Sequence, residues 1–116
     1  MISNELLKGT LKTIILNLLE DHDRMYGYAI TQEVEKISEG QIQLSWGALY
    51  PTLHKLEADG LITAEEHSIG KRVRKYYRLT PEGKKTSRDK VEEFREFVRI
   101  MGQLLKPSPG INLNYA

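Results

Sequence analysis

The sequence predicts a mainly α-helical fold that carries one small β-hairpin, an α+β protein. Apolar residues recur at helical spacing in four stretches of the chain, and two alternating segments bracket a glycine-containing turn. The last helical stretch is longer than the core of a 116-residue chain can cover. We therefore expect residues 1–80 to form one compact domain, residues 81–105 a long C-terminal helix, and residues 106–116 a flexible tail.

The composition excludes several classes of protein. Cysteine is absent, which removes disulfides, thiolate metal sites and thiol catalysis. The histidines lie in separate predicted elements without a metal-ligand spacing, and Gly70-Lys71 lacks the upstream glycine of a phosphate-binding loop. The first residues show no basic region followed by a long apolar core, and no run of about 18 apolar residues occurs, so neither secretion nor membrane spanning is expected. These observations predict a cytoplasmic protein that is not an enzyme, does not contact a membrane, and needs no cofactor or metal.

Charge is unevenly distributed along the chain, although the net charge is only +1. Residues 1–66 hold five Lys and Arg against eleven Asp and Glu, whereas residues 68–79 hold five basic residues and no acid. The basic residues of that segment are Lys71, Arg72, Arg74, Lys75 and Arg78. A local positive field, not the net charge, attracts phosphates. The segment is therefore a candidate nucleic-acid contact.

The first helix is expected to begin near Ser3 or Asn4 and to present one broad apolar face. The residues of that face are Leu6, Leu7, Leu11, Ile14, Ile15, Leu18 and Leu19. A face of this width predicts burial on two sides. Within the pattern, Gly9 either permits the close approach of another helix or is tolerated near a frayed end.

The second helix is expected over residues 27–38, with Ile30, Val34 and Ile37 pointing inward and Gly40 just beyond its end. The next residues, 41–44, alternate between polar and apolar side chains and predict a very short strand.

Two tyrosines, Tyr26 and Tyr28, flank Gly27 at the start of the second helix. The free amides there can face an anion such as a phosphate. Alternatively, either tyrosine fills the rim of the core.

The third helix, over residues 45–60, has clear ends. Ser45 is a good N-cap, and Gly60 suits the left-handed position just beyond the helix. The face predicted to be buried carries Trp46, Leu49, Leu53 and Leu56. The opposite face carries Gly47, Ala48, Pro51, His54 and Lys55, and its first turns are small enough to approach another surface closely. Pro51 cannot donate to the carbonyl of Gly47, so we expect a distorted first turn.

Segments 61–66 and 73–79 are the predicted strands of the hairpin, with a basic turn over residues 67–72. Alternation places Val73, Lys75, Tyr77 and Leu79 on one side of the second strand, and Arg74, Tyr76 and Arg78 on the other. The hairpin is therefore expected to project as a basic finger.

The last helix is expected to begin at Pro81 with Thr80 as its cap. Its second half carries residues at coiled-coil spacing, namely Val91, Phe94, Val98, Met101 and Leu105. Phe97, Ile100 and Leu104 add a flanking stripe. A helix of this length spans roughly 35 Å. Because the small core cannot cover it, we expect its second half to pack against another subunit.

Three helices, a basic hairpin and a protruding helix are typical of a winged helix-turn-helix protein with a long C-terminal dimerisation helix. Across residues 6–105 the chain resembles the short, single-domain type of PadR-family transcriptional regulator. The resemblance rests on LKGTL at residues 7–11, YGYAI at 26–30, SWGALYPTL at 45–53, LEADGLI at 56–62, RKYYRLT at 74–80, and EG at 82–83. Each motif is weak alone, but their order and spacing are specific.

This resemblance implies a homodimer that binds an inverted-repeat operator on double-stranded DNA and usually represses. It implies that the dimer interface is formed by the first and last helices, through Leu7, Leu11, Val91, Phe94, Val98, Met101 and Leu105. It also implies that Ser45 and Tyr50 lie against DNA. The basic hairpin over residues 61–79, called the wing below, is implied to contact the phosphates or the minor groove.

The residues themselves agree with a DNA-binding wing. Lys71, Arg72, Arg74 and Lys75 are suited to neutralise phosphates, which positions a protein without specifying sequence. The residues expected to contact the base edges are Gly47, Ala48, Thr52, His54 and Lys55. Tyr28 and Gly70 complete the predicted DNA-binding set. Because few of these side chains make bidentate base contacts, DNA shape is expected to contribute to specificity.

Two questions stay open at the level of sequence. Some similar repressors respond to drugs, and Phe94, Phe97 and Met101 could line a site for a small aromatic effector between subunits. Heptad spacing equally explains these residues as plain interface core. The alternative function is a winged-helix module that binds protein or RNA, because a fold alone does not fix function.

Overall fold

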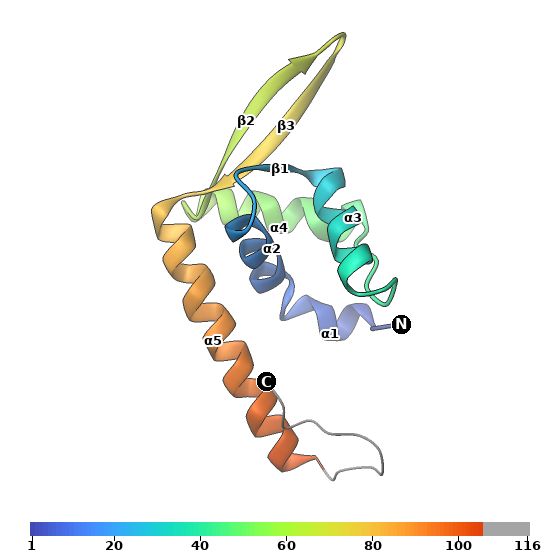
Figure 1. Ribbon diagram of the computed structural model, residues 1–116, viewed down its shortest axis with the longest axis vertical. Helices are drawn as coiled ribbons and strands as arrows, with labels where there is room; N and C mark the ends of the chain where they lie inside the picture. Colours follow the sequence, from blue (N-terminus) through green and yellow to red (C-terminus); the bar gives the residue numbers. More distant parts are fainter. Residues whose placement is uncertain (106–116) are drawn as a thin grey trace.

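The computed structural model describes residues 1–105, so the predicted tail at 106–116 lies outside the described residues. The elements in order are α1 (Asn4–Lys8), α2 (Leu11–Glu20), β1 (Met25–Tyr26), α3 (Gly27–Ile37), α4 (Trp46–Ala58), β2 (Ile62–Ile69), β3 (Arg72–Leu79) and α5 (Pro81–Leu104). The strands form one antiparallel sheet in the order β1-β3-β2. Figure 1 shows the β2–β3 hairpin projecting from one end of the molecule, while α5 runs from its base in the opposite direction. Within residues 1–105, none of the helices is long and apolar enough to cross a membrane.

The first predicted helix is two helices, because Gly9 and Thr10 interrupt it. The Ser3 hydroxyl accepts from the Leu6 amide at 3.4 Å at the start of α1, and the Gly9 amide donates to the Leu7 carbonyl at its end. A Cβ added at Gly9 would meet no atom within 4 Å. Among residues 1–105 no helix approaches Gly9 closely, and its role is to end α1.

Two predictions around α3 are wrong. Ile30 and Val34 are buried as expected, but Ile37 is the last residue of α3 and is 64% exposed. The chain turns directly after it, through left-handed residues that include Gly40, so Ile37 lies beyond the last core layer. The predicted strand at 41–44 is also absent from the described structure. Its backbone is instead held by the Ile2 amide on the Gln41 carbonyl (2.9 Å) and by the Ile42 amide on the Ser38 hydroxyl (3.0 Å).

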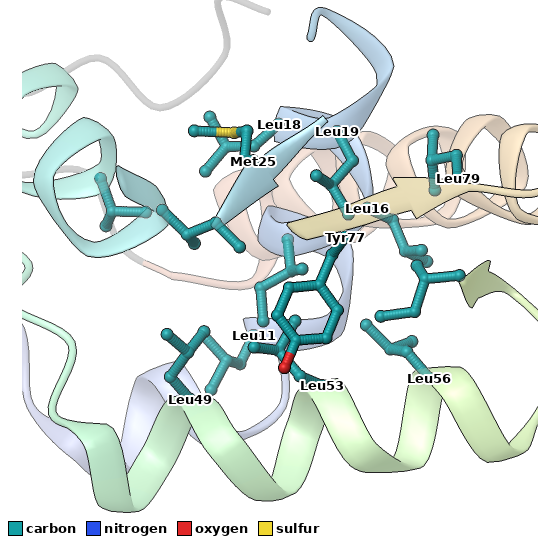
Figure 2. Packing of buried hydrophobic residues seen from close by; sticks show 14 residues of the cluster. Leu11, Leu16, Leu18, Leu19, Met25, Leu49, Leu53, Leu56, Tyr77 and Leu79 are labelled. Carbon is teal, nitrogen blue, oxygen red and sulfur yellow. The ribbon is translucent and has the colours of Figure 1, made fainter. Parts of the chain in front are cut away.

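The core lies between α2, α3, α4 and the inner face of the sheet. The broad face of α2 supplies Leu11, Ile15, Leu16, Leu18 and Leu19, and α4 supplies Leu49, Leu53 and Leu56. Figure 2 shows the ring of Tyr77 extending from β3 towards Leu49 and Leu53 of α4. Burial raises the pKa of Tyr77 to about 12, because the ionised phenolate is disfavoured away from water. The predicted burial is confirmed for Leu11, Ile15, Leu18 and Leu19 of α2 and for the three leucines of α4. It is wrong for Leu6, which is 69% exposed, and Leu16 is fully buried although the predicted face did not include it.

The start of α5 packs directly on Leu61, in the short segment that joins α4 to β2. The Thr80 hydroxyl accepts from the Gly83 amide at 3.0 Å, and Pro81 follows in the first turn, as predicted. A Cβ added at Gly83 would overlap the carbonyl oxygen of Leu61. Further along, Ser87 is fully buried and brings α5 close to the rest of the fold. Glycine is therefore required at position 83 for contact rather than for backbone angle.

We predict that Gly83→Ala lowers the free energy of unfolding by about 3 kcal/mol, because the added methyl displaces α5 from the Leu61 carbonyl. Gly9→Ala is the matched control, because it adds the same methyl group in open space at an ordinary φ of −81°. It should stabilise by roughly 0.5 kcal/mol or leave stability unchanged. Urea unfolding followed by circular dichroism measures both changes, and equal effects would contradict the packing of α5 described above.

Candidate nucleic-acid interface

Helix α4 has the ends that its sequence predicts. The Ser45 hydroxyl accepts from the Ala48 amide at 3.2 Å. At the other end Gly60 has φ +75°, its amide donates to the Glu57 carbonyl at 3.0 Å, and the Leu61 amide donates to the Leu56 carbonyl at 3.0 Å. These two bonds form a Schellman motif, which only a residue tolerant of positive φ closes without strain.

The proline of α4 does not break the helix. The element is continuous from Trp46 to Ala58, so the expected distortion at Pro51 does not interrupt it. Gly47, whose carbonyl loses a donor to Pro51, is exposed, so water can hydrate that carbonyl. The carbonyl of Ala48, which follows that of Gly47 in the helix, accepts a hydrogen bond from the Thr52 hydroxyl at 3.0 Å.

Trp46 is not buried with the leucines, and that prediction is wrong. Its side chain is 53% exposed, and its six-membered ring lies against Gly27 at the start of α3. A Cβ added at Gly27 would come within 2.8 Å of Trp46 Cη2, so glycine makes room for the ring. From this anchor an aromatic row follows the exposed side of α4. Ring centroids are 6.1 Å apart for Trp46 and Tyr50, and 4.8 Å apart for Tyr50 and His54.

The wing is longer and tighter than its sequence predicts. Strands β2 and β3 pair through Ile69 and Arg72, so the predicted turn at 67–72 shrinks to Gly70 and Lys71. Gly70 has φ +61° at the first central position, the requirement of a type II′ turn. Such a turn matches the twist of the flanking strands, so the ladder continues almost to the tip of the hairpin.

The predicted division of β3 into two faces is confirmed. Tyr77 and Leu79 are buried towards the helices, whereas Arg74 and Tyr76 lie on the other face with Tyr26. Arg78 also lies there and pairs with Asp23 at 3.4 Å and Glu65 at 3.3 Å. Its charge is therefore neutralised locally.

The other cations of the wing are not neutralised in this way. Among residues 1–105, no ion pair involves Lys71, Arg72, Arg74 or Lys75. These four residues keep their positive charge available to a partner.

A groove of about 290 Å³ lies between β3 and the first turns of α3 and α4. Its lining includes Tyr28, Trp46, Tyr50, Arg72, Arg74 and Lys75. The fold thus brings the aromatic row of α4 and the cations of the wing to one side of the molecule. Aromatic faces beside unpaired cations are suited to a polyanion with sugars and bases, such as a nucleic acid.

The other predicted site residues do not line this groove. Ser45, Gly47, Ala48 and Thr52 line a second depression beside α1. Lys55 lies further along α4 and pairs with Asp59 at 3.2 Å. Sequence reasoning did not assign Trp46 or Tyr26 to the site. The signal for Trp46 was present in its distance of one helical turn from Tyr50, but its leucine-like periodicity favoured the core.

Comparison with known proteins identifies the family. Residues 15–89 match the family model described as "Transcriptional regulator PadR-like family". The chain belongs to this family. It is also 39% identical over 80 residues to a transcriptional regulator of Mycobacterium tuberculosis, covering 69% of this chain and 71% of the relative.

Solved structures of PadR-like proteins have the same fold. A transcriptional regulator from Clostridium thermocellum is 30% identical, with a TM-score of 0.82 over 91% of this chain and 100% of that one. A PadR family transcriptional regulator from Eggerthella lenta is 32% identical, with a TM-score of 0.75 over 90% of this chain and 88% of that one. The protein is therefore a winged-helix transcriptional regulator of the PadR family and not an enzyme.

We predict that Gly27→Ala displaces the Trp46 ring and lowers the free energy of unfolding by about 2 kcal/mol. Trp46 is the only tryptophan, so its emission should shift to the red as the ring moves into water. The same substitution in a Trp46→Ala background should cost little, because the clashing ring is gone. Equal destabilisation in both backgrounds would contradict the contact.

Proposed function

We propose that this PadR-like protein is a homodimeric repressor that binds an inverted-repeat operator through α4 and the β2–β3 wing. The observation that carries the proposal is the groove in which exposed aromatic residues of α4 meet unpaired cations of β3. A helix entering the major groove beside a hairpin on the backbone is the usual docking arrangement of helix-turn-helix relatives.

The wing supplies affinity in this proposal. Lys71, Arg72, Arg74 and Lys75 neutralise phosphates and release counterions, so binding weakens as salt rises. Phosphate contacts of this kind set the position of the protein and not its choice of sequence.

Helix α4 supplies position in the major groove and part of the sequence preference. Gly47 and Ala48 are small and exposed, which supports close approach of the helix to the bases. Ser45 and Tyr50 fix the backbone, while Tyr28 approaches it from the start of α3. Thr52, His54 and Lys55 face the bases, with Lys55 exchanging its exposed Asp59 partner for DNA at small cost.

Dimerisation is supported by the apolar second half of α5. Phe94, Phe97, Val98 and Leu104 are exposed on this helix in a single copy of the chain, and so is Leu105 directly after its end. Val91 and Met101 of the same seam are half-buried. A continuous apolar stripe of this length is costly in water and is typical of a protein interface.

The first helices offer a smaller share of the proposed interface. Leu7 and Leu11 are each only 7% exposed within their own chain, whereas Leu6 is 69% exposed. In α1, Leu6 is therefore the leucine that a second subunit can contact, whereas Leu7 and Leu11 are largely buried within their own chain. A two-fold axis through such an interface would present two copies of α4 to two half-sites.

Replacing Lys71, Arg72, Arg74 and Lys75 with alanine is predicted to lower duplex-DNA affinity at least about 100-fold at low salt. The slope of log K against log salt should flatten by up to about 3.6, at about 0.9 per lost phosphate contact. The matched control removes four exposed cations elsewhere, Lys36, Lys84, Lys85 and Arg95. It should change affinity far less. Retained duplex binding by the wing variant would contradict the proposal, and a preference for RNA or a protein would favour the alternative function.

We predict that Val98→Glu or Met101→Glu converts the dimer to monomers, because a carboxylate at the seam would be buried without a partner. Gln103→Glu adds the same charge at an exposed position off the seam and should leave the dimer intact. Light scattering measures the mass of each variant. Dimers that survive both seam substitutions would place the interface elsewhere.

The proposed relief of repression by a small aromatic effector rests on Phe94, Phe97 and Met101. The two phenylalanine rings have centroids 6.0 Å apart, a spacing that suits a wall against which a planar ligand can stack. Titration calorimetry of the dimer with a broad panel of aromatic drugs and phenolic acids is expected to give heat with at least one compound. No heat with any member would contradict effector binding and leave the phenylalanines as interface core.

A further inference from the structure

Arg74 is held in place on the outer face of the sheet by two tyrosines. Its guanidinium carbon lies 4.0 Å from the centroid of the Tyr26 ring, and its Nη1 donates to the Tyr76 hydroxyl at 3.4 Å. The tyrosines are themselves partners across β1 and β3, with ring centroids 5.6 Å apart at 77°. The side chain of Arg74 is therefore oriented without meeting a negative charge.

The other two arginines of this face are held differently. Arg78 pairs with Asp23 and Glu65. Arg24 lies over the Tyr76 ring at 4.4 Å and donates to His67 Nε2 at 2.9 Å, which uses one of its donors. Neither Arg24 nor Arg74 has an ion pair among residues 1–105, but Arg74 is the one of the three that lines the groove beside α4.

A tyrosine ring under a guanidinium suits a contact to phosphate. The ring occupies the flat face of the guanidinium, so the in-plane N–H donors still point outward. Holding a long side chain in one conformation before binding also lowers the entropy lost on binding.

The stack also connects two parts of the fold. Tyr26 belongs to β1, directly before α3, whereas Arg74 lies in the part of β3 that extends beyond its pairing with β1. Both residues line the groove between the wing and α4. The stack therefore ties Arg74 of the wing to the strand that leads into α3.

We propose that Tyr26 is a positioning residue for DNA binding, which holds Arg74 and the wing ready for phosphate contact. The inference rests on the proposed function and assigns Tyr26 a role through Arg74 rather than through its own contact with DNA.

A double-substitution cycle tests this, with affinity for a labelled mixed-sequence 30-base-pair duplex measured by fluorescence anisotropy at low salt. Tyr26→Leu should weaken binding about fivefold, a size in the range of an exposed cation–π contact. The same change in an Arg74→Ala background should have no further effect. Tyr26→Phe keeps the ring and should bind within about twofold of the unaltered protein.

Arg74→Lys gives a second test that leaves Tyr26 unchanged. It keeps the charge but loses the planar stack, so affinity should fall about threefold to fivefold while the salt slope stays the same. Arg72→Lys is the matched control, because no stack on a tyrosine holds Arg72 among residues 1–105, and it should bind within about twofold.

The positioning role would be overturned if Tyr26→Leu lowered duplex affinity equally with and without Arg74, or lowered it in neither background. It would also be overturned if Arg74→Lys and Arg72→Lys changed affinity by the same factor. Failure of the unaltered protein to bind any duplex would instead refute the proposed function, so the two failures are distinguishable.

Discussion

The carbonyl oxygen of Leu61 is the point at which the three functional elements of this protein meet. It accepts from the Thr80 amide at 3.1 Å, directly after the Schellman motif that ends α4. The Thr80 hydroxyl lies 3.1 Å from the same oxygen and 2.8 Å from the Gly60 carbonyl oxygen, to which it can donate instead. Residue 62 begins β2, and Gly83 places the first turn of α5 against the same oxygen. The direction of the recognition helix, the root of the wing and the departure of α5 are therefore set by one small cluster of backbone contacts.

This arrangement separates the surfaces by chemistry. One side of the molecule carries the aromatic row of α4 and the cations of the wing, while the second half of α5 carries an apolar seam at a distance from them. A basic, aromatic surface is suited to nucleic acid, and a continuous apolar stripe is suited to a second copy of the chain. The near-zero net charge of the chain hides this division, because the acids lie mostly before residue 67.

Local signals in the sequence were enough to predict α3, α4 and α5 and the caps of the last two, but not the break between α1 and α2. Ser45, Gly60 and Thr80 act as predicted because capping depends on neighbouring residues, and the leucines of α4 are buried because their spacing leaves one face for the core. The family was also recognisable from short motifs in order. Of the residues that the sequence proposed for DNA contact, Tyr28, Tyr50, Arg72, Arg74 and Lys75 lie at one groove.

The errors concern contacts between segments that are distant in the sequence. Trp46 has the spacing of a core residue, and only the position of Gly27 shows that its ring rests outside the core on α3. Strand β1 has two residues and exists because Tyr26 meets Tyr76, a partner fifty residues away in the chain. Ile37 fits a helical stripe, but the stripe extends past the end of the buried layer. No periodicity within a single segment encodes these contacts.

The central claim is that the face formed by α4 and the wing reads double-stranded DNA as a symmetric dimer. Selection of genomic fragments by the purified protein, followed by sequencing of the bound pool, tests it most directly. We expect enrichment of fragments that share an inverted repeat, with half-sites separated by about one helical turn or a multiple of it. A bound pool without a common repeat, or no enrichment over a wing variant, would contradict it.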